Sequence, residues 1–175
     1  MIRIPVRARE RSTTRVHPTS SFMLIVALTG NIASGKSVVA SRLAARHWPG
    51  PLTLVLTGGE RRVPARLRGP EGGVAVRWTS HPGLQRLLQA YGDPITSTSA
   101  NRPRQPPAMT AGEIVQQWQA DITQGTIRVL DGGRLVPSPP STVVDCTGSR
   151  PRVIRPGAIA SAVLRESAPD LIGEF

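Results

Sequence analysis

Residues 47–56 read HWPGPLTLVL, a turn rich in proline and glycine followed by a short apolar run. Proline and glycine interrupt regular structure, so we expect Trp48–Pro51 to form a structural turn. A mostly apolar run of this length, bounded by turn residues, is typical of a strand buried in a sheet. The sequence therefore predicts that the chain enters a sheet at Leu52–Leu56. The segments on either side of this strand decide the fold.

Upstream of the turn, residues 30–37 read GNIASGKS, a complete G-x-x-x-x-G-K-S phosphate loop. Gly30 and Gly35 allow backbone N–H groups to surround phosphate oxygens, and Lys36 adds a positive charge at a helix N-terminus. Ser37 is the residue that could hold magnesium. The sequence thus predicts a phosphate-binding loop directly ahead of the turn.

The longer stretch 23–44, MLIVALTGNIASGKSVVASRLA, resembles the opening of dephospho-coenzyme A kinases. Such a kinase continues with a strand that ends in an acidic pair and then with a lid, and nothing here matches them. VLD (129–131) and VVD (143–145) imitate a strand that orients magnesium, but such endings are common by chance. A phosphate-loop nucleotide kinase is therefore one alternative for the function.

Strands and helices alternate along the chain, which indicates an α/β protein with a largely buried sheet. Apolar runs predict strands at 24–28, 52–56, 74–78, 95–97, 126–130, 141–145 and 152–155. Amphipathic stretches predict helices at 36–46, between Ser80 and Gly92, at 110–118 and at 157–166.

The helix between Ser80 and Gly92 carries clear start and stop signals. Ser80 is expected to cap it, and Gly92 to end it. Its buried face is expected to consist of Leu84, Leu87, Leu88 and Tyr91. In the next helix, Thr110 and Glu113 are expected to form a capping box.

Five stretches match another family in the right order. They are HWPGPLTLVL (47–56), VAVRWTSHP (74–82), YGDPITSTSANRPRQPPAMT (91–110), PSTVVD (140–145) and VIRPGAI (153–159). They resemble the YrdC-like threonylcarbamoyl-AMP synthases over residues 46 to about 165. Five ordered motifs are more specific than one loop, so the fold implied is a YrdC-like twisted mixed sheet with flanking helices.

The resemblance implies a nucleotidyltransferase. That family joins L-threonine, bicarbonate and ATP into threonylcarbamoyl-AMP and pyrophosphate, the first half of N6-threonylcarbamoyladenosine formation in tRNA. By resemblance, His81, Ser99 and Ser141 match positions that contact threonine, and Arg77, Asn101 and Arg155 match positions that hold ATP. The family has no obvious nucleophile, so we assign no catalytic side chain. We expect catalysis through alignment and charge neutralisation by arginine and magnesium.

The same residues have local explanations as well. Short hydroxyls and an amide in STSAN (97–101) suit a small polar ligand at a strand end, or a turn that satisfies its own backbone. Arg77 could bind a phosphate or carboxylate through two parallel hydrogen bonds, or be a surface arginine. His81 could be a helix cap, Ser141 a strand-edge hydroxyl and Arg155 a solvated charge.

The chain also departs from the family. Members begin with a strand, a PTETVYGL-like segment and a lysine–arginine element that meets the ATP phosphates, and Lys36 is the only lysine here. In the SAN motif, Pro103 and Arg104 replace a serine and a glycine, and Met109 replaces a frequent threonine. We therefore expect a domain that lacks the family's N-terminal portion, either truncated or inactive, or compensated by the phosphate loop. The first account needs no special geometry and is favoured.

Local pattern and the two resemblances together predict four segments. They are a disordered basic tail at 1–22, a phosphate-loop strand–loop–helix at 23–45, the YrdC-like domain at 46–165 and a tail at 166–175.

Composition and net charge indicate which class of partner and which cellular compartment to expect. The 175 residues suit one domain, and a single cysteine, Cys146, fits a reducing cytoplasm. The net charge of +11, from 22 basic and 11 acidic residues, favours a polyanion such as tRNA or double-stranded RNA. An RNA-binding module is therefore a second alternative. The longest apolar run, Phe22–Leu28, is too short to span a membrane.

Overall fold

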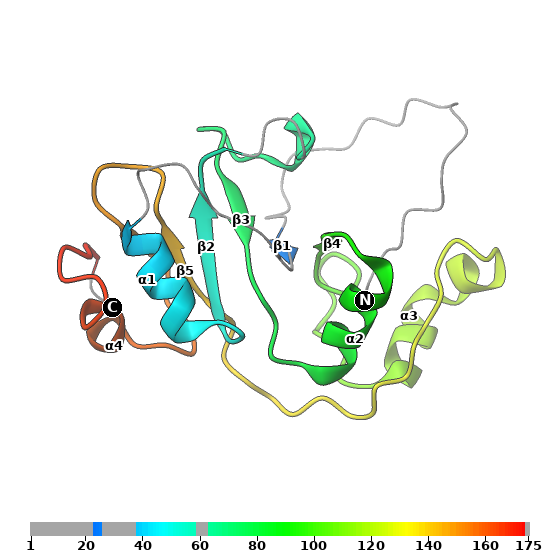
Figure 1. Ribbon diagram of the computed structural model, residues 1–175. Helices are drawn as coiled ribbons and strands as arrows, with labels where there is room; N and C mark the ends of the chain where they lie inside the picture. The colour runs from blue at the N-terminus through cyan, green and yellow to red at the C-terminus, as the bar shows by residue number, and fades with distance from the viewer. Residues whose placement is uncertain (1–22, 26–37, 59–62, 174–175) are drawn as a thin grey trace. The chain divides into compact units, whose positions relative to one another are not determined.

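The computed structural model describes residues 23–25, 38–58 and 63–173, which are drawn in colour in Figure 1. The predicted phosphate loop, with Gly30, Gly35, Lys36 and Ser37, lies outside the described residues. The chain forms two compact units. The sheet unit comprises Leu24–Pro94 and Pro137–Phe175, and the smaller helical unit is built around Ile95–Val136. Each unit is described by itself.

Four strands form the sheet of the sheet unit. In spatial order they are β3 (Val74–Val76), β2 (Leu52–Leu56), β5 (Thr142–Asp145) and β6 (Arg152–Arg155). The central strands β2 and β5 run parallel, and each edge strand is antiparallel to its neighbour. The starts of β2 and β5 and the ends of β3 and β6 therefore lie at one end of the sheet. A mixed sheet with flanking helices confirms the predicted fold class.

Helices α1 (Val38–His47) and α4 (Ser161–Arg165) pack against one face of this sheet (Figure 1). Apolar side chains from alternate positions of the strands meet apolar residues of the two helices, because side chains alternate between faces along a strand. Ala168 and Leu171, beyond α4, belong to the same core. The buried members are Ala40, Leu43, Leu52, Leu54, Leu56, Val74, Val76, Val144, Val153, Leu164, Ala168 and Leu171.

The turn between α1 and β2 is structural, as expected. The indole Nε1 of Trp48 donates to the Leu52 carbonyl at 2.8 Å, which fastens the turn to the strand that it introduces. A Cβ on Gly50 would lie 2.4 Å from the His47 carbonyl oxygen, so the backbone can pass there only as glycine. A short 3₁₀ helix, η1 (Ala65–Leu67), follows later in the loop before β3.

Helix α2 (Pro82–Tyr91) differs from expectation in two details. Its N-cap is His81, whose Nδ1 accepts a hydrogen bond from the Leu84 N–H at 3.3 Å, and not Ser80. Pro82 occupies the first helical position, directly after this cap. Tyr91 is 41% exposed, because it is the last helical residue and lies past the turn that buries Leu88. Gly92 ends the helix with φ 77°, as predicted.

The helical unit contains β4 (Ile95–Ser97), which pairs with β1 (Met23–Ile25), and α3 (Ala111–Thr123). The expected capping residues are confirmed, with the Glu113 N–H donating to Thr110 Oγ1 at 3.2 Å. The Glu113 carboxylate, however, accepts from the backbone N–H of Met109 at 2.7 Å, one residue before the cap. The expected end of α3 was wrong, because the helix continues past a kink at residue 118.

The predicted strand at 126–130 was also wrong. The backbone N–H groups of Thr126 and Ile127 both donate to the Asp121 carbonyl, and the Thr126 hydroxyl does so too, at 2.8 Å. These donors bond to a carbonyl near the C-terminal end of α3, so they are not available to a sheet.

Within the described part of the chain, no helix has the length and apolar content that crossing a bilayer requires.

Candidate functional site

Four polar side chains lie at the end of the sheet where β2 and β5 begin. Arg77 directly follows β3, Arg155 closes β6, Thr53 is the second residue of β2, and Ser141 directly precedes β5. Thr53 pairs with Val143, and Val143 pairs with Arg155. Because side chains alternate between faces, these residues share the face opposite the helix-covered core. We call Arg77, Thr53, Ser141 and Arg155 the arginine–hydroxyl row.

A β-bulge in β6 brings Arg155 into this row. Val144 pairs with Val153, whereas Val143 pairs with Arg155, so Ile154 is an extra residue in the ladder. In a regular strand, residues 153 and 155 would point to the same face, which is the core. The inserted residue changes the alternation, as bulges do, and turns the arginine to the opposite face.

The hydroxyl of Ser141 lies at the centre of the row. Arg155 Nη2 donates to Ser141 Oγ at 3.0 Å and to the Ser141 carbonyl at 2.9 Å, and Arg155 Nε reaches the same carbonyl at 3.3 Å. Ser141 Oγ lies 2.8 Å from Thr53 Oγ1. Ser141 and Thr53 are 2% and 1% exposed, so the hydroxyl pair is closed off from solvent. The row therefore fixes one edge of the Arg155 guanidinium.

Arg77 approaches from the other edge of the sheet. Its Nε donates to the Gly50 carbonyl at 3.0 Å, which ties the side chain to the turn before β2. Burial, and after it the positive charge of Arg155, lowers the pKa of the Arg77 guanidinium. Two half-buried arginines are therefore within electrostatic range of each other, an arrangement that an anion between them would stabilise.

The loop after β6 folds back onto the segment before β5. The Ala158 N–H donates to the Pro140 carbonyl at 2.9 Å, and the Thr142 hydroxyl bridges the carbonyl and the N–H of Ile159. A Cβ on Gly157 would lie 2.3 Å from the Pro140 oxygen, so only glycine permits this approach. The loop residues that follow Arg155 are thereby held against the residues that flank Ser141.

His81 belongs to the same unit and lies at the start of α2. Its ring is exposed, and its Nδ1 accepts the capping hydrogen bond from Leu84. Its backbone N–H donates to Thr79 Oγ1 at 3.1 Å. The ring is therefore oriented by the helix cap, and its Nε2 is the nitrogen that a ligand could contact.

Ser99 and Asn101 belong to the helical unit. Ser99 is exposed. The Asn101 side-chain amide donates to the carbonyls of Gln105 at 2.8 Å and Arg102 at 3.2 Å, so it closes the turn that follows it. Asn101 therefore has a local structural role here, and its carboxamide oxygen is the atom available for a further contact.

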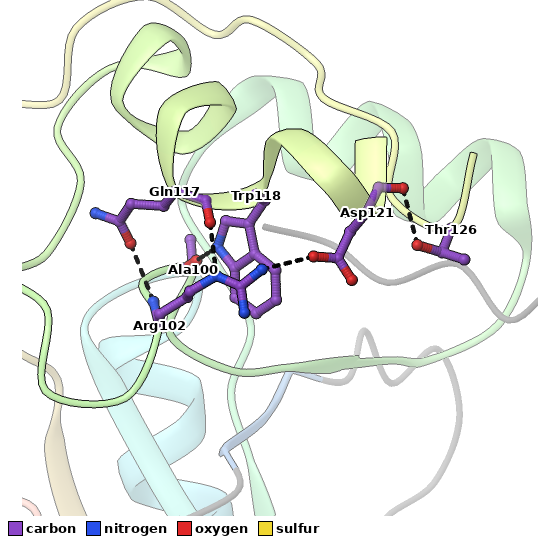
Figure 2. Close-up of polar contacts among 6 residues, drawn as sticks. All are labelled: Ala100, Arg102, Gln117, Trp118, Asp121 and Thr126. Atoms are coloured by element: carbon purple, nitrogen blue, oxygen red, sulfur yellow. Dashed lines mark hydrogen bonds and ion pairs between the residues drawn. The ribbon is translucent and has the colours of Figure 1, made fainter. Parts of the chain in front are cut away.

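Arg102 fastens this loop to α3 (Figure 2). Its guanidinium lies 4.3 Å from the centre of the Trp118 ring, donates from Nε to the Gln117 carbonyl at 2.6 Å and pairs with Asp121 at 2.7 Å. The Arg102 N–H donates to Gln117 Oε1 at 3.0 Å, and the Trp118 indole donates to the Ala100 carbonyl at 2.6 Å. Residues on both sides of Asn101 are thus tied to one helix.

Asp145 and Cys146, at the other end of β5, have structural roles. The Asp145 carboxylate accepts from the N–H and the hydroxyl of Thr147 at 2.9 and 2.7 Å, a local turn contact. Burial, and then the neighbouring Asp145 charge, raises the pKa of the Cys146 thiol to about 12. That thiol stays protonated at neutral pH and is not a nucleophile.

The structure thus brings Arg77, Ser141 and Arg155 together at one end of the sheet and adds Thr53, which sequence reasoning missed. A polar residue inside the run LTLVL was the available signal, since it marks a face that is not core. Within the described ranges, no group of three or more His, Cys, Asp or Glu side chains could hold a metal ion.

Comparisons with known proteins bear on the family and on the fold. A family model for the Sua5, YciO and YrdC proteins, described as telomere recombination, matches residues 15–157. The threonylcarbamoyl-AMP synthase of Vibrio campbellii is 40% identical over 91 residues, 52% of this chain and 48% of that protein. The threonylcarbamoyl-AMP synthase of Pyrococcus abyssi is 36% identical over 136 residues, 78% of this chain and 37% of that protein.

Solved structures give the same result. Pyrococcus abyssi Sua5 complexed with L-threonine matches with a TM-score of 0.70 and 28% identity, over 87% of this chain and 45% of that one. YciO of Escherichia coli matches with a TM-score of 0.60 and 29% identity, over 78% of this chain and 66% of that one. The chain spans about half the length of the curated relatives it matches.

Proposed function

The chain belongs to the Sua5/YciO/YrdC family, and on that premise we propose that it is a threonylcarbamoyl-AMP synthase-type nucleotidyltransferase. The reaction joins L-threonine, bicarbonate and ATP into threonylcarbamoyl-AMP and pyrophosphate, for the modification of tRNA. The observation that carries the proposal is the convergence of Arg77 and Arg155 beside Ser141, in a chain whose relatives are named threonylcarbamoyl-AMP synthases.

ATP is the ligand for which the two arginines are best suited. A carbamate oxygen attacks the α-phosphorus of ATP, and pyrophosphate leaves, so negative charge gathers on phosphate oxygens in the transition state. Guanidinium groups bind such oxygens through paired hydrogen bonds and lower the energy of the developing charge. Arg77 and Arg155 fill this role in the proposal, with Asn101 as a further contact to the nucleotide.

Threonine is assigned to His81, Ser99 and Ser141. Imidazole and hydroxyl groups can bind the carboxylate, ammonium and hydroxyl of an amino acid. The exposure of Ser99 and of His81, whose Nδ1 alone is used by the cap, supports direct contact, whereas Ser141 is assigned from its motif position because its hydroxyl is buried against Thr53 and Arg155. Pyrococcus abyssi Sua5 was solved in complex with L-threonine, which supports the choice of substrate.

Magnesium would arrive with ATP, because this ion is usually held by substrate phosphates and a few protein oxygens. The described residues offer no acidic cluster for it. The candidate protein ligand is Ser37, in the phosphate loop with Gly30, Gly35 and Lys36. We favour ATP binding that depends on the arginines of the sheet and not on Lys36, because the sheet motifs are the ones the family shares.

Composition supports a proposal for the partner and for the cellular location. A net charge of +11 supports tRNA or double-stranded RNA as a partner, and this charge keeps an RNA-binding module as the second candidate function. The single cysteine supports a cytoplasmic location.

The deciding experiment incubates the full chain with ATP, threonine, bicarbonate and magnesium. We expect pyrophosphate and threonylcarbamoyl-AMP in equal amounts, measured by chromatography. Arg155→Ala should weaken ATP binding at least about tenfold, since a charged contact to phosphate is lost. Lys36→Ala, the matched loss of a cation from the phosphate loop, should leave it unchanged.

Two results would contradict the proposal. Absence of product together with tight tRNA binding would favour the RNA-binding module. Loss of ATP binding in Lys36→Ala, with Arg155→Ala harmless, would assign the nucleotide to the phosphate loop.

A further inference from the structure

We propose that Thr53 is a positioning residue of the arginine–hydroxyl row: its hydroxyl fixes Ser141 Oγ, and Ser141 fixes the guanidinium of Arg155 in the orientation that binds the anionic substrate. The positioning role involves Thr53, Ser141 and Arg155 alone. That the oriented guanidinium binds ATP rests on the proposed function.

The contacts form a short relay across three strands. Thr53 Oγ1 on β2 lies 2.8 Å from Ser141 Oγ, and Ser141 Oγ accepts from Arg155 Nη2 on β6 at 3.0 Å. A hydroxyl has one proton and two lone pairs, so Ser141 Oγ can accept from arginine and still bond to threonine. Both residues are at least 98% buried, which limits water as a competing partner of their hydroxyls.

The relay selects one rotation of the guanidinium. Arg155 turns its Nε and Nη2 edge toward Ser141, with three donor contacts to the carbonyl and the hydroxyl. The opposite edge of a planar guanidinium then points away from Ser141. If Ser141 Oγ rotated, Arg155 would lose one of its acceptors, so the threonine that restrains this hydroxyl also restrains the arginine.

A threonine suits this task better than other residues of its size. Its branched Cβ restricts χ1 and favours a strand, so its hydroxyl keeps one direction. Valine has the same shape but no hydroxyl, and serine keeps the hydroxyl without the branch. These two substitutions separate the hydrogen bond from the packing.

The test follows the Arg155 guanidinium by NMR in the full chain. The rate of rotation about its Nε–Cζ bond is measured, with the signal assigned through Arg155→Lys. In Thr53→Val we expect rotation at least about tenfold faster, because one hydrogen bond of the relay is lost. Thr53→Ser should stay close to the parent chain.

A matched control is available one residue along from Ser141. Thr142 is 1% exposed like Thr53, but its hydroxyl bonds to the backbone of Ile159 on the core side of the sheet. Thr142→Val removes a buried strand hydroxyl of the same kind. We expect it to speed Arg155 rotation less than Thr53→Val does, because its hydroxyl contacts Ile159 and not Ser141.

Nucleotide binding is measured on the same variants by titration with ATP. If Thr53→Val speeds Arg155 rotation and weakens ATP binding, both the positioning role and the proposed function are supported. If rotation speeds up but the parent chain binds no ATP, the positioning role stands and the proposed function fails. If rotation in folded Thr53→Val equals that of the parent, the positioning role is overturned whatever ATP does.

Two additional measurements keep the test decisive should Thr53→Val not fold. In the parent chain, the hydroxyl protons of Thr53 and Ser141 should exchange slowly with water, and exchange at the rate of a free hydroxyl would overturn the proposal. In Ser141→Ala, Arg155 should rotate faster than in the parent, because it loses its hydroxyl acceptor and keeps the carbonyl of residue 141, and an unchanged rate would overturn the proposal.

Discussion

Arg155 is restrained by a serine that is in turn restrained by a threonine. Both residues are almost fully buried, and Ser141 Oγ accepts from the charged Arg155, so a hydrogen bond here is worth more, and a missing one costs more, than at the surface. The carbonyl of Ser141 takes two further donor contacts from the same guanidinium. The orientation of the Arg155 guanidinium thus depends on Ser141 directly and, in our proposal, on Thr53 through it.

His47, at the end of α1, gives a residue-level prediction on pH. Its Nε2 is buried and makes no hydrogen bond among the described residues. Burial, then the charge of Arg46, lowers its pKa from the usual 6.5, with Glu166 opposing. Near pH 6 the unfolded chain therefore binds more protons at this residue than the folded one. The contribution of His47 to the free energy of unfolding is fully present above about pH 6.5 and is lost as the pH falls below that value.

Replacing the titrating ring tests this sign. His47→Phe keeps a ring of similar shape and removes the proton site, so the loss of unfolding free energy between pH 7.5 and 5.5 should be smaller than in the parent chain. Denaturant unfolding followed by circular dichroism measures it at both pH values. An unchanged pH dependence would mean that other groups account for the acid sensitivity.

At the level of elements, α3 and the loop before it form one local assembly. The helix departs from helical geometry at Trp118, where φ is −123°. The Gln117 carbonyl beside this kink accepts the Arg102 Nε–H, and Asp121, one turn later, accepts its Nη2 (Figure 2). A single side chain thereby contacts the helix on both sides of the kink and holds the loop that contains Asn101.

Arg102→Met should loosen this assembly. A charged hydrogen bond, an exposed ion pair and a cation–π contact are lost together, so we expect the free energy of unfolding to fall by about 1–2 kcal/mol. The indole N–H of Trp118, which donates to Ala100, should also exchange faster with solvent, as NMR would record.

Arg104 supplies the matched control for this loop. It lies two residues from Arg102, is exposed and loses the same charge in Arg104→Met. We expect that variant to unfold within about 0.5 kcal/mol of the parent, as is usual for a surface change. Equal effects of the two substitutions would contradict the anchoring role of Arg102.

For the whole molecule, charge and the division into units matter most. Arg77, His81, Ser141 and Arg155 belong to the sheet unit, whereas Ser99 and Asn101 belong to the helical unit.

The net charge of +11 predicts salt-dependent binding of tRNA. If about five phosphates are neutralised, raising salt from about 50 to about 200 mM should weaken binding about 100- to 500-fold. Fluorescence anisotropy with labelled tRNA measures this change. An affinity that is independent of salt would show that the basic surface does not contact the phosphate backbone.

Local pattern was enough for several features that depend on neighbours in the sequence. The bounds of β2, β4 and β6 follow from short apolar runs between turn residues, and Gly92 and Thr110 act where helix signals place them. The same reasoning failed at 126–130, because the hydrogen-bonding groups there are used by the end of α3.

The arginine–hydroxyl row could not be assembled from pattern. Arg77 and Arg155 are named by the family motifs, but their meeting depends on strand order, with β2 and β5 parallel between two antiparallel edges. Thr53 is a polar residue within an otherwise apolar run, but its place beside Ser141 and Arg155 follows only from the pairing of the strands. The face that Arg155 occupies depends on the bulge at Ile154, since period-two alternation alone would point it into the core.

Residue types and their spacing thus specify the α/β class, most of the strands and helices, and the family, because these depend on short-range preferences and on ordered motifs. Packing of strands that are distant in the chain specifies which polar groups meet and which way each one points. The hydrogen bonds of the row have donor–acceptor distances of 2.8–3.0 Å, and they form only if packing places the two atoms correctly to a fraction of an ångström. The spacing of residues along the chain does not determine positions that finely.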